Sequence, residues 1–269
     1  MKYVLDNDLH IHSELSLCSN HPEQTADNLL KYAENANLKS LCVTDHYWDE
    51  TVPGASDWYK IQNTEHINAI LPLPKSDKVD FRFGCETEMD KNGVIGLAPE
   101  HADRFAFIVV PINHFHMESF TIPVGESSPE ARAKALVKHF EYLLNSKLPL
   151  SKVGVAHLNC DLMAKPYSDE GIAAIFDSIP FSDWDALFKE AKKKGLGIEL
   201  NLAGFTYRGE RIDDSIFRPF MIARDNGCKF YFASDSHTPE DRIPEVYHAK
   251  ANRVINKLGL TEDLKYKMI

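Results

Sequence analysis

Histidine and acidic residues recur where the short apolar stretches of this sequence end. The first stretch ends in His10-Ile11-His12, and the last is followed by Asp235-Ser236-His237. Side chains two residues apart on a strand point to the same face, so the two members of each pair could coordinate one metal ion. Residues of the same types close the intervening stretches at His46, Glu86, His114 and His157. These positions are candidate ligands of a metal centre.

The types of these side chains indicate which metals they would hold. Imidazole and carboxylate groups suit zinc, iron or manganese, whereas calcium takes oxygen ligands alone. The candidates outnumber the roughly three to six ligands of a single ion, and a carboxylate can bridge two ions. The pattern therefore predicts a cluster of two or three divalent transition metal ions.

Two further residues leave the register of the ligands open. Glu88 and His116 share a strand face with Glu86 and His114, so a shift of two residues would exchange them. The remaining histidines lie in helical or loop contexts, where we expect structural roles: His21, His66, His101, His139 and His248. Among them, His139 lies among residues with the spacing of a helix core and is expected to pack.

Short strand-like stretches alternate with amphipathic ones along the chain. The strand-like stretches are Leu5–His12, Ser40–His46, Asp80–Glu88, Phe105–His114, Lys152–Leu158, Leu196–Leu202 and Lys229–Asp235. The expected helices are Thr25–Asn37, Pro129–Leu148, Asp183–Lys194 and Asp213–Asn226. Ser128 suits a helix N-cap and Gly195 a helix C-terminus. The long connections 47–60, 115–128 and 160–182 are expected to form the walls of a pocket.

Seven strands in this alternation predict an α/β fold with a parallel sheet and helices outside. We favour a closed barrel, with an open doubly wound sheet as the alternative. In both folds, ligands bind at the carboxyl ends of the strands, which is where the metal candidates lie. No glycine-rich dinucleotide or P-loop motif follows a strand, so the sequence does not indicate a nucleotide site of either kind.

Length and charge narrow the class of protein. The 269 residues are expected to form one barrel domain over 1–269, since α/β barrels of this size fold as a unit. With 30 basic against 40 acidic residues the net charge is −10, which disfavours nucleic-acid and anionic-membrane partners. No apolar run is long enough to span a membrane, and Met1–Asp8 lacks the apolar core of a signal peptide. Five cysteines without a CxxC motif indicate reduced thiols and a cytoplasmic location.

Several short motifs follow one another in a specific order. They are Asp8-Leu9-His10-Ile11-His12-Ser13, Ser16, Cys18, Val43-Thr44-Asp45-His46, Gly84-Cys85-Glu86, His114, His157 and Ala233-Ser234-Asp235-Ser236-His237. As a set they resemble the polymerase and histidinol phosphatase (PHP) family over residues 8–241. The segment Ile112-Asn113-His114 departs from the S-x-H pattern usual in that family.

The resemblance implies a distorted (β/α)7 barrel with a trinuclear metal centre at the C-terminal ends of its strands. The three implied ligand sets are His10, His12, Glu86 and Asp235; the bridging Glu86 with His114 and His157; and His46, His237 and Cys18. Related phosphatases usually have histidine or aspartate where this chain has Cys18. A thiolate is a sound zinc or iron ligand, so we expect Cys18 to bind metal, with a packing role as the alternative.

The C-terminal third most resembles histidinol-phosphate phosphatases, in the segments Gly197–Gly204 and Thr238–Asp241. This implies metal-dependent hydrolysis of a small phosphorylated metabolite, with histidinol phosphate as one candidate. Metal ions a few ångströms apart can bind phosphate and generate hydroxide from water. We therefore expect a hydroxide bridging the metals to attack phosphorus. We expect Asp235 or His237 to protonate the leaving alkoxide, with a metal-bound water as the alternative.

Three other residues are candidate substrate contacts. Arg208 and Arg211 follow the sixth strand-like stretch, and their guanidinium groups suit phosphate oxygens; solvated loop charges are the alternative. Asn201, at the end of that stretch, is expected to contact substrate, whereas Glu199 supports the barrel interior.

Two other classes of function remain open at this stage. An amidohydrolase acting on C–N bonds also begins with an HxH motif. Its usual marks are a carboxylated lysine or a glutamate on a middle strand and eight βα units, whereas this sequence has no lysine at a strand end and only seven predicted strands. A noncatalytic metal-binding PHP domain would hold metal without hydrolysis, and the nearly complete ligand set argues against it. No residue pattern marks a redox cofactor.

Overall fold

All strand pairs of the fold run parallel in the computed structural model of the chain. The structure describes residues 1–205, 209–242 and 244–268, and within these ranges it contains nine strands. They are β1 (Asn7–Ile11), β2 (Ser40–Val43), β3 (His46–Tyr47), β4 (Asp80–Phe83), β5 (Cys85–Thr87), β6 (Ile108–Val110), β7 (Val153–Val155), β8 (Gly197–Asn201) and β9 (Lys229–Ala233). One sheet has the order β1-β2-β4 and the other β3-β5-β6-β7-β8-β9.

The two sheets join into one distorted barrel. After short breaks, β2 is followed by β3 and β4 by β5, so the nine strands form seven segments, as expected. The remaining seam lies between β1 and β9, where Asp235 N donates to His10 O at 2.8 Å and His12 N to Ser236 O at 3.1 Å. These bonds close the ring, which confirms the closed barrel over the open sheet.

The break between β4 and β5 depends on Gly84. A Cβ at this position would lie 2.5 Å from Phe107 O and 2.7 Å from Cys42 Sγ, so only glycine allows this close approach. Gly84 N still donates to Val43 O at 2.8 Å, and Glu86 N donates to Asp45 O at 3.0 Å. The segment therefore stays paired through its break and carries Glu86 to the mouth of the barrel.

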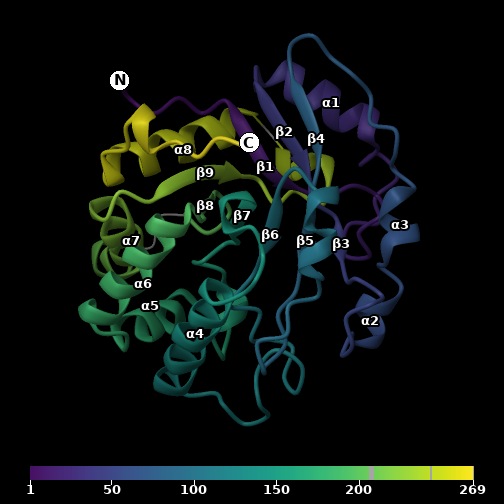
Figure 1. Cartoon of the computed structure of the whole chain (residues 1–269). Coiled ribbons are helices and arrows are strands. Elements are labelled where there is room, and N and C mark those ends of the chain that lie inside the picture. Colours follow the sequence, from purple (N-terminus) through teal and green to yellow (C-terminus); the bar gives the residue numbers. More distant parts are fainter. Residues whose placement is uncertain (206–208, 243, 269) are drawn as a thin grey trace.

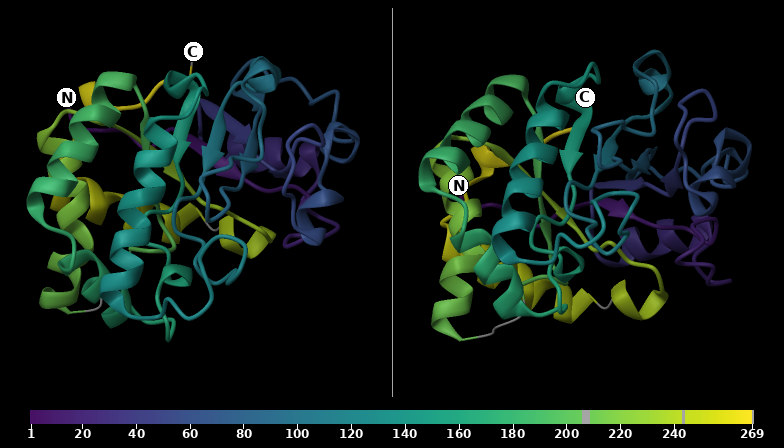
Figure 2. Two further views of the ribbon diagram at one scale, coloured as in Figure 1. Left: turned by 60° about the horizontal axis from the view of Figure 1, so that its bottom comes forward. Right: turned by 90° about the horizontal axis from the view of Figure 1, so that it is seen from below.

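Helices lie outside the barrel (Figure 1). They are α1 (Ala26–Asn35), α2 (Asp57–Lys60), α3 (Thr64–Asn68), α4 (Pro129–Leu144), α5 (Asp169–Asp177), α6 (Phe181–Lys194), α7 (Glu210–Asp225) and α8 (Pro244–Leu258). Helices α4 to α7 pack together on one flank, and α1 to α3 lie on the opposite flank (Figure 2). The expected connections 47–60 and 160–182 are wrong in part because they contain α2 and α5, and the helices α3 and α8 were not expected.

Local signals set the ends of the expected helices. Ser128 accepts a hydrogen bond from Ala131 N at 3.2 Å and is followed by Pro129, which suits the first helical turn. Gly195 ends α6 with φ 75°, a left-handed conformation that favours glycine. Both end signals are confirmed.

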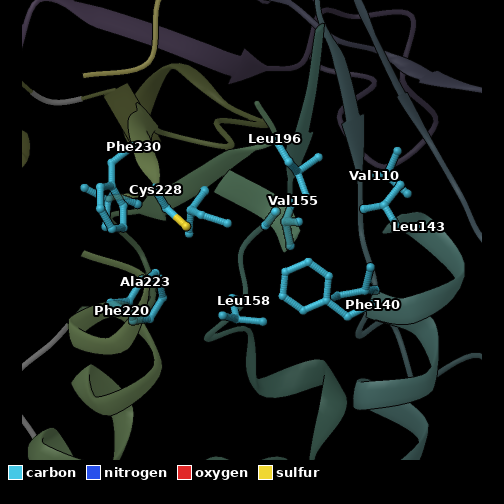
Figure 3. Packing of buried hydrophobic residues seen from close by; sticks show 14 of the residues in the cluster. Val110, Phe140, Leu143, Val155, Leu158, Leu196, Phe220, Ala223, Cys228 and Phe230 are labelled. Atoms are coloured by element: carbon cyan, nitrogen blue, oxygen red, sulfur yellow. The ribbon is translucent and has the colours of Figure 1, made fainter. Parts of the chain in front are cut away.

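Apolar side chains fill the space on both sides of the strands. Between sheet and helices, one cluster contains Val110 and Val155 of the sheet, Phe140 of α4 and Phe220 of α7 (Figure 3). Inside the barrel a second cluster contains Leu9, Cys42, Phe107, Val109, Ala156, Tyr231 and Ala233. This inner cluster lies beneath the polar residues of the strand ends. No helix among the described residues is long and apolar enough to cross a bilayer.

Candidate metal centre

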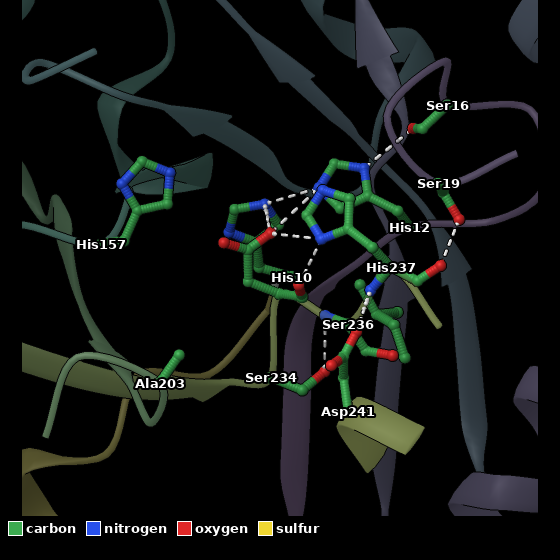
Figure 4. A network of polar contacts seen from close by, with 12 residues as sticks. His10, His12, Ser16, Ser19, His157, Ala203, Ser234, Ser236, His237 and Asp241 are labelled. Carbon is green, nitrogen blue, oxygen red and sulfur yellow. Dashed lines mark hydrogen bonds and ion pairs between the residues drawn. The ribbon is translucent and has the colours of Figure 1, made fainter. Parts of the chain in front are cut away.

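The carboxyl ends of the strands surround a cavity of about 460 Å³. Its walls are formed by Cys18, His46, Trp58, Tyr59, Glu86, His114, His116, Met117, His157, Cys160, Leu162, Asp235 and His237. His10 and His12 are fully buried and extend toward the same group of side chains (Figure 4). The structure thus brings together all nine residues that the sequence and its resemblance nominate as ligands.

Glu86 occupies the centre of this group. Its Oε2 lies 3.4 Å from His10 Nε2, 3.3 Å from His12 Nε2 and 3.0 Å from His46 Nδ1. Its Oε1 lies 3.5 Å from His157 Nε2. One carboxylate that faces four imidazoles through both oxygens has the placement of a bridging ligand.

Asp235 reaches the cluster from a strained turn. Its Oδ1 lies 3.5 Å from His10 Nε2 and 3.2 Å from His12 Nε2. β9 ends at Ala233, and Asp235 has φ 53°, a left-handed conformation that costs free energy in a residue other than glycine. The expectation that Asp235 and His237 share a strand face is therefore wrong, because a turn after β9 places both side chains.

Three groups of ligand atoms lie close enough to hold one ion each. Within each group the atoms are within 4.8 Å of one another. The groups are His10, His12 and Glu86; Glu86, His114 and His157; and His12, Cys18, His46 and His237. Glu86 is common to the first two groups, in agreement with the resemblance, and His12 joins the third as well.

Buried partners orient the imidazoles. Nδ1 of His10 lies 2.9 Å from Glu199 Oε2, and Nδ1 of His114 lies 2.7 Å from Glu88 Oε2. Glu88 therefore orients His114, and the alternative register that would exchange Glu86 for Glu88 is not the one observed. Such outer partners fix the ring and tautomer of a metal-binding histidine.

The third oriented ring is that of His12. Its Nδ1 lies 2.8 Å from Ser16 Oγ, which donates to Asp45 Oδ1 at 2.7 Å. Sequence reasoning missed the roles of Glu88 and Asp45 as orienting groups, since residue spacing does not encode contacts between strands.

The donor set fits a divalent cation. Among the described residues, Glu86 Oε1 and His157 Nδ1 are buried without a hydrogen-bond partner, and His46 Nδ1 makes no hydrogen bond although it lies 3.0 Å from Glu86 Oε2. Buried polar atoms without partners are costly and rare in proteins. Nitrogen, carboxylate oxygen and one thiol together suit zinc, iron or manganese, as expected from the sequence.

Charges in the cluster are strongly coupled. Burial alone would raise the pKa of Glu86, but the imidazoles of His46 and His10 outweigh it and hold this pKa well below its usual range. Burial alone would lower the pKa of His12, but Asp235 and Glu86 raise it to about 9. A cation entering the cluster would therefore replace protons carried by its imidazoles.

Cys18 contributes a thiol to the third group. Desolvation of the thiol and the nearby carboxylates of Glu86 and Asp235 raise its pKa, which disfavours the thiolate. A bound cation would reverse this effect, because a metal deprotonates a coordinating thiol. The geometry thus places Cys18 where the resemblance puts a ligand.

The three residues predicted to contact substrate differ in where the structure places them. Arg208 lies outside the described residues, and Arg211 is exposed in the first turn of α7 and does not line the cavity. Asn201 Nδ2 donates to Asp235 Oδ2 at 3.3 Å, and its Oδ1 accepts from Ala203 N at 3.0 Å. Their contacts with substrate stay predictions.

The histidines assigned to structural roles include one clear case. His139 lies on the buried face of α4, where it is 3% exposed and its ring packs edge-on against the ring of Phe115. His116 is exposed on the cavity wall and belongs to none of the three ligand groups among the described residues.

Comparisons with known proteins agree with this architecture. A "Probable phosphatase" of Caldicellulosiruptor saccharolyticus is 21% identical over 262 residues, which cover 94% of this chain and 92% of that protein. A similar fold occurs in the crystal structure of histidinol phosphate phosphatase from Lactococcus lactis subsp. lactis, complexed with zinc, L-histidinol and phosphate. That comparison has a TM-score of 0.57 and 16% identity, and covers 98% of this chain and 100% of the other. The PHP domain family model matches residues 8–203. The chain therefore belongs to the PHP domain family.

Proposed function

We propose that this protein is a metal-dependent phosphatase that hydrolyses a small phosphomonoester. The observation that carries the proposal is the position of Glu86, which faces four imidazoles and is common to two adjacent ligand groups. The similarity to a probable phosphatase over nearly the whole chain supports the same activity.

The metals of this proposal are two or three ions of zinc, iron or manganese, held by His10, His12, Cys18, His46, Glu86, His114, His157, Asp235 and His237. Such ions, when bound, neutralise phosphate oxygens and lower the pKa of water so that it can act as the nucleophile. The residues of the chain would hold these ions at the mouth of the barrel, where Glu199, Glu88 and Ser16 fix three of the imidazole rings.

Proton transfer to the leaving group falls to the two residues after β9. Asp235 lines the cavity and is within reach of the cluster through Oδ1. Nδ1 of His237 lies 2.8 Å from the backbone oxygen of Asp235, which leaves its Nε2 available to the cavity. We propose that Asp235 or His237, whichever of the two is not bound to a metal through the reacting atom, donates the proton that the departing alkoxide requires.

The cavity also has an apolar side. Trp58, Tyr59, Met117 and Leu162 line it together with the metal candidates. Apolar walls with a few polar groups suit an organic molecule, so the substrate is a phosphate ester of a small organic alcohol. The structure from Lactococcus lactis holds L-histidinol and phosphate, and histidinol phosphate is therefore the first metabolite to test.

The test is phosphate release from a panel of esters. The protein is freed of metal, then loaded separately with zinc, manganese or iron and given p-nitrophenyl phosphate, glycerol phosphate or histidinol phosphate. We expect release that depends on the metal and stops when a chelator is added. Release from no ester with any of the metals, or hydrolysis of amides alone, would contradict the proposal.

A further inference from the structure

A smaller cavity of about 210 Å³ adjoins the metal centre. It shares His157, Cys160 and Asp235 with the larger cavity, and the segment after β8 closes its other side at Ala203 and Gly204. In Figure 4, Ala203 and His157 lie on the side of the cluster away from Ser16 and Ser19. The organic part of a substrate bound at the metals can thus extend in this direction.

Asn159 lines this smaller cavity and has no polar partner among the described residues. Its side chain is fully buried, and neither Nδ2 nor Oδ1 makes a hydrogen bond within the part of the chain that the structure describes. Its neighbour Asn201 has both ends of its amide engaged, with Asp235 and Ala203. An unpaired buried amide destabilises the fold, so its presence in a cavity wall points to a ligand.

The backbone holds the Asn159 amide in place. Cys160 N donates to His157 O at 2.8 Å, which forms the turn that carries Asn159 after β7. On the opposite side, a Cβ at Gly204 would lie 2.4 Å from Asn159 Nδ2, so the glycine allows the amide to fit against this backbone. Asn159 is therefore fixed in position before any ligand arrives.

A free amide offers two hydrogens and one acceptor oxygen. A hydroxyl group, which both donates and accepts, matches this set. The carboxylates of Asp161 and Asp235 also line the cavity and would repel a second anion there. We propose that Asn159 binds a hydroxyl group on the organic part of the phosphomonoester. This inference rests on the proposed function, because it places the phosphate at the metal centre.

Binding of two matched phosphonates tests this role without turnover. Butylphosphonate and dihydroxybutylphosphonate have equal length, and neither is an ester that the protein could hydrolyse. Calorimetry with the metal-loaded protein gives both affinities. We expect the dihydroxy compound to bind about tenfold more tightly, since its hydroxyl pairs an amide that otherwise stays unpaired. A ratio near one in the unmodified protein would overturn the inference.

Two variants locate the effect at Asn159. Asn159→Leu removes the amide, and Gly204→Ala displaces it. In both variants the affinity for dihydroxybutylphosphonate should exceed that for butylphosphonate by less than about threefold, while butylphosphonate binding itself changes little. An unchanged ratio in either folded variant would overturn the inference. Asn226→Leu is the matched control, because its Nδ2 donates to Asp185 Oδ1 and Ile222 O outside both cavities.

Melting temperatures separate binding from a structural role. Asn226→Leu should melt at a lower temperature than the unmodified protein and keep its affinity ratio for the two phosphonates. Asn159→Leu should melt at the same temperature as the unmodified protein or higher. A comparable loss in Asn159→Leu would mean that the amide supports the fold, which would overturn the inference. If the ratio holds but no ester is hydrolysed, the proposed function alone fails. If esters are hydrolysed and the ratio is near one, only the role of Asn159 fails.

Discussion

The carboxylate of Glu199 lies 2.9 Å from Nδ1 of His10, and both side chains are fully buried at the base of the cluster. Tyr231 donates to the same carboxylate oxygen at 3.0 Å. Because Nδ1 faces Glu199, Nε2 of His10 is the atom directed at Glu86 and Asp235. Glu199 thus supports the barrel interior, as expected from the sequence, and also fixes the orientation of a candidate ligand.

Replacing Glu199 should weaken metal binding without removing a ligand. In Glu199→Gln the side chain keeps its shape but loses the charge that makes His10 a stronger donor. We expect zinc affinity to fall about 10- to 100-fold, measured by competition with a chromophoric chelator. Glu190→Gln, at a partly exposed position of α6 where the carboxylate pairs with Lys193 and Lys194, is the control and should bind zinc normally. Equal affinities for the two variants would show that Glu199 has no such role.

The third ligand group makes a prediction about Cys18. Its Sγ lies within 4.8 Å of the nitrogen ligand atoms of His12, His46 and His237. In Cys18→Ser, loss of the thiolate should reduce the metal bound per chain by one ion, measured by mass spectrometry of the intact protein under native conditions. Cys160→Ser is matched, since Cys160 lines the same cavity outside the three groups. An unchanged metal count in Cys18→Ser would leave Cys18 a packing residue.

The apolar wall predicts a change in substrate preference. Trp58 is 37% exposed, and its ring lies 5.0 Å from that of His46 in an edge-to-face arrangement. Trp58→Ala should raise the KM for naphthyl phosphate about tenfold, because apolar contact with the leaving group is lost, and should affect glycerol phosphate much less. Phe181→Ala, an exposed aromatic residue on α6, serves as control. Equal effects on both esters would argue against a leaving-group site at Trp58.

His139 makes stability depend on pH. Burial lowers the pKa of its imidazole to about 4, from an ordinary value of 6.5. Between pH 4 and pH 6.5 the unfolded chain binds a proton at His139 that the folded chain does not bind. The neutral imidazole therefore makes its full contribution to the free energy of unfolding above pH 6.5, and this contribution is lost as the pH falls to 4. The difference is about 3 kcal/mol, and it should disappear in His139→Leu.

Urea unfolding at several pH values measures this difference. The exposed His248 provides the control His248→Leu, which should keep the pH dependence of the unmodified protein. If His139→Leu retains the same loss of stability between pH 6.5 and 4, burial of this imidazole is not the cause.

The sequence predicted the elements whose signals are local. Ser128 and Gly195 marked helix ends that the structure confirms, and the alternation of seven strand-like stretches with helical ones predicted the parallel α/β barrel. Helix α5 was missed because it has only nine residues and contains Gly171, which weakens its helical pattern. Its apolar face becomes recognisable only where it packs against α4 and α7.

Contacts between distant segments were beyond local patterns. The pairing of Glu88 with His114 joins β5 to a different strand end, and a sequence shows only that both types are present. The left-handed conformation of Asp235 likewise follows from its backbone bond to His10 across the seam of the barrel. Asn159 carried no signal in the sequence, because only its lack of partners in the described part of the folded chain distinguishes it.

The most direct test of the account is metal content and phosphate release in Glu86→Gln. This change keeps the size of the side chain but removes the charge that faces four imidazoles. Glu50→Gln, on the exposed surface, is the matched control.

We predict that the unmodified protein and Glu50→Gln bind two or three transition metal ions per chain and release phosphate in a metal-dependent reaction. Glu86→Gln should remain folded, bind fewer ions and lose at least about 100-fold in rate. A folded Glu86→Gln protein with the full metal content and an unchanged rate would contradict the account.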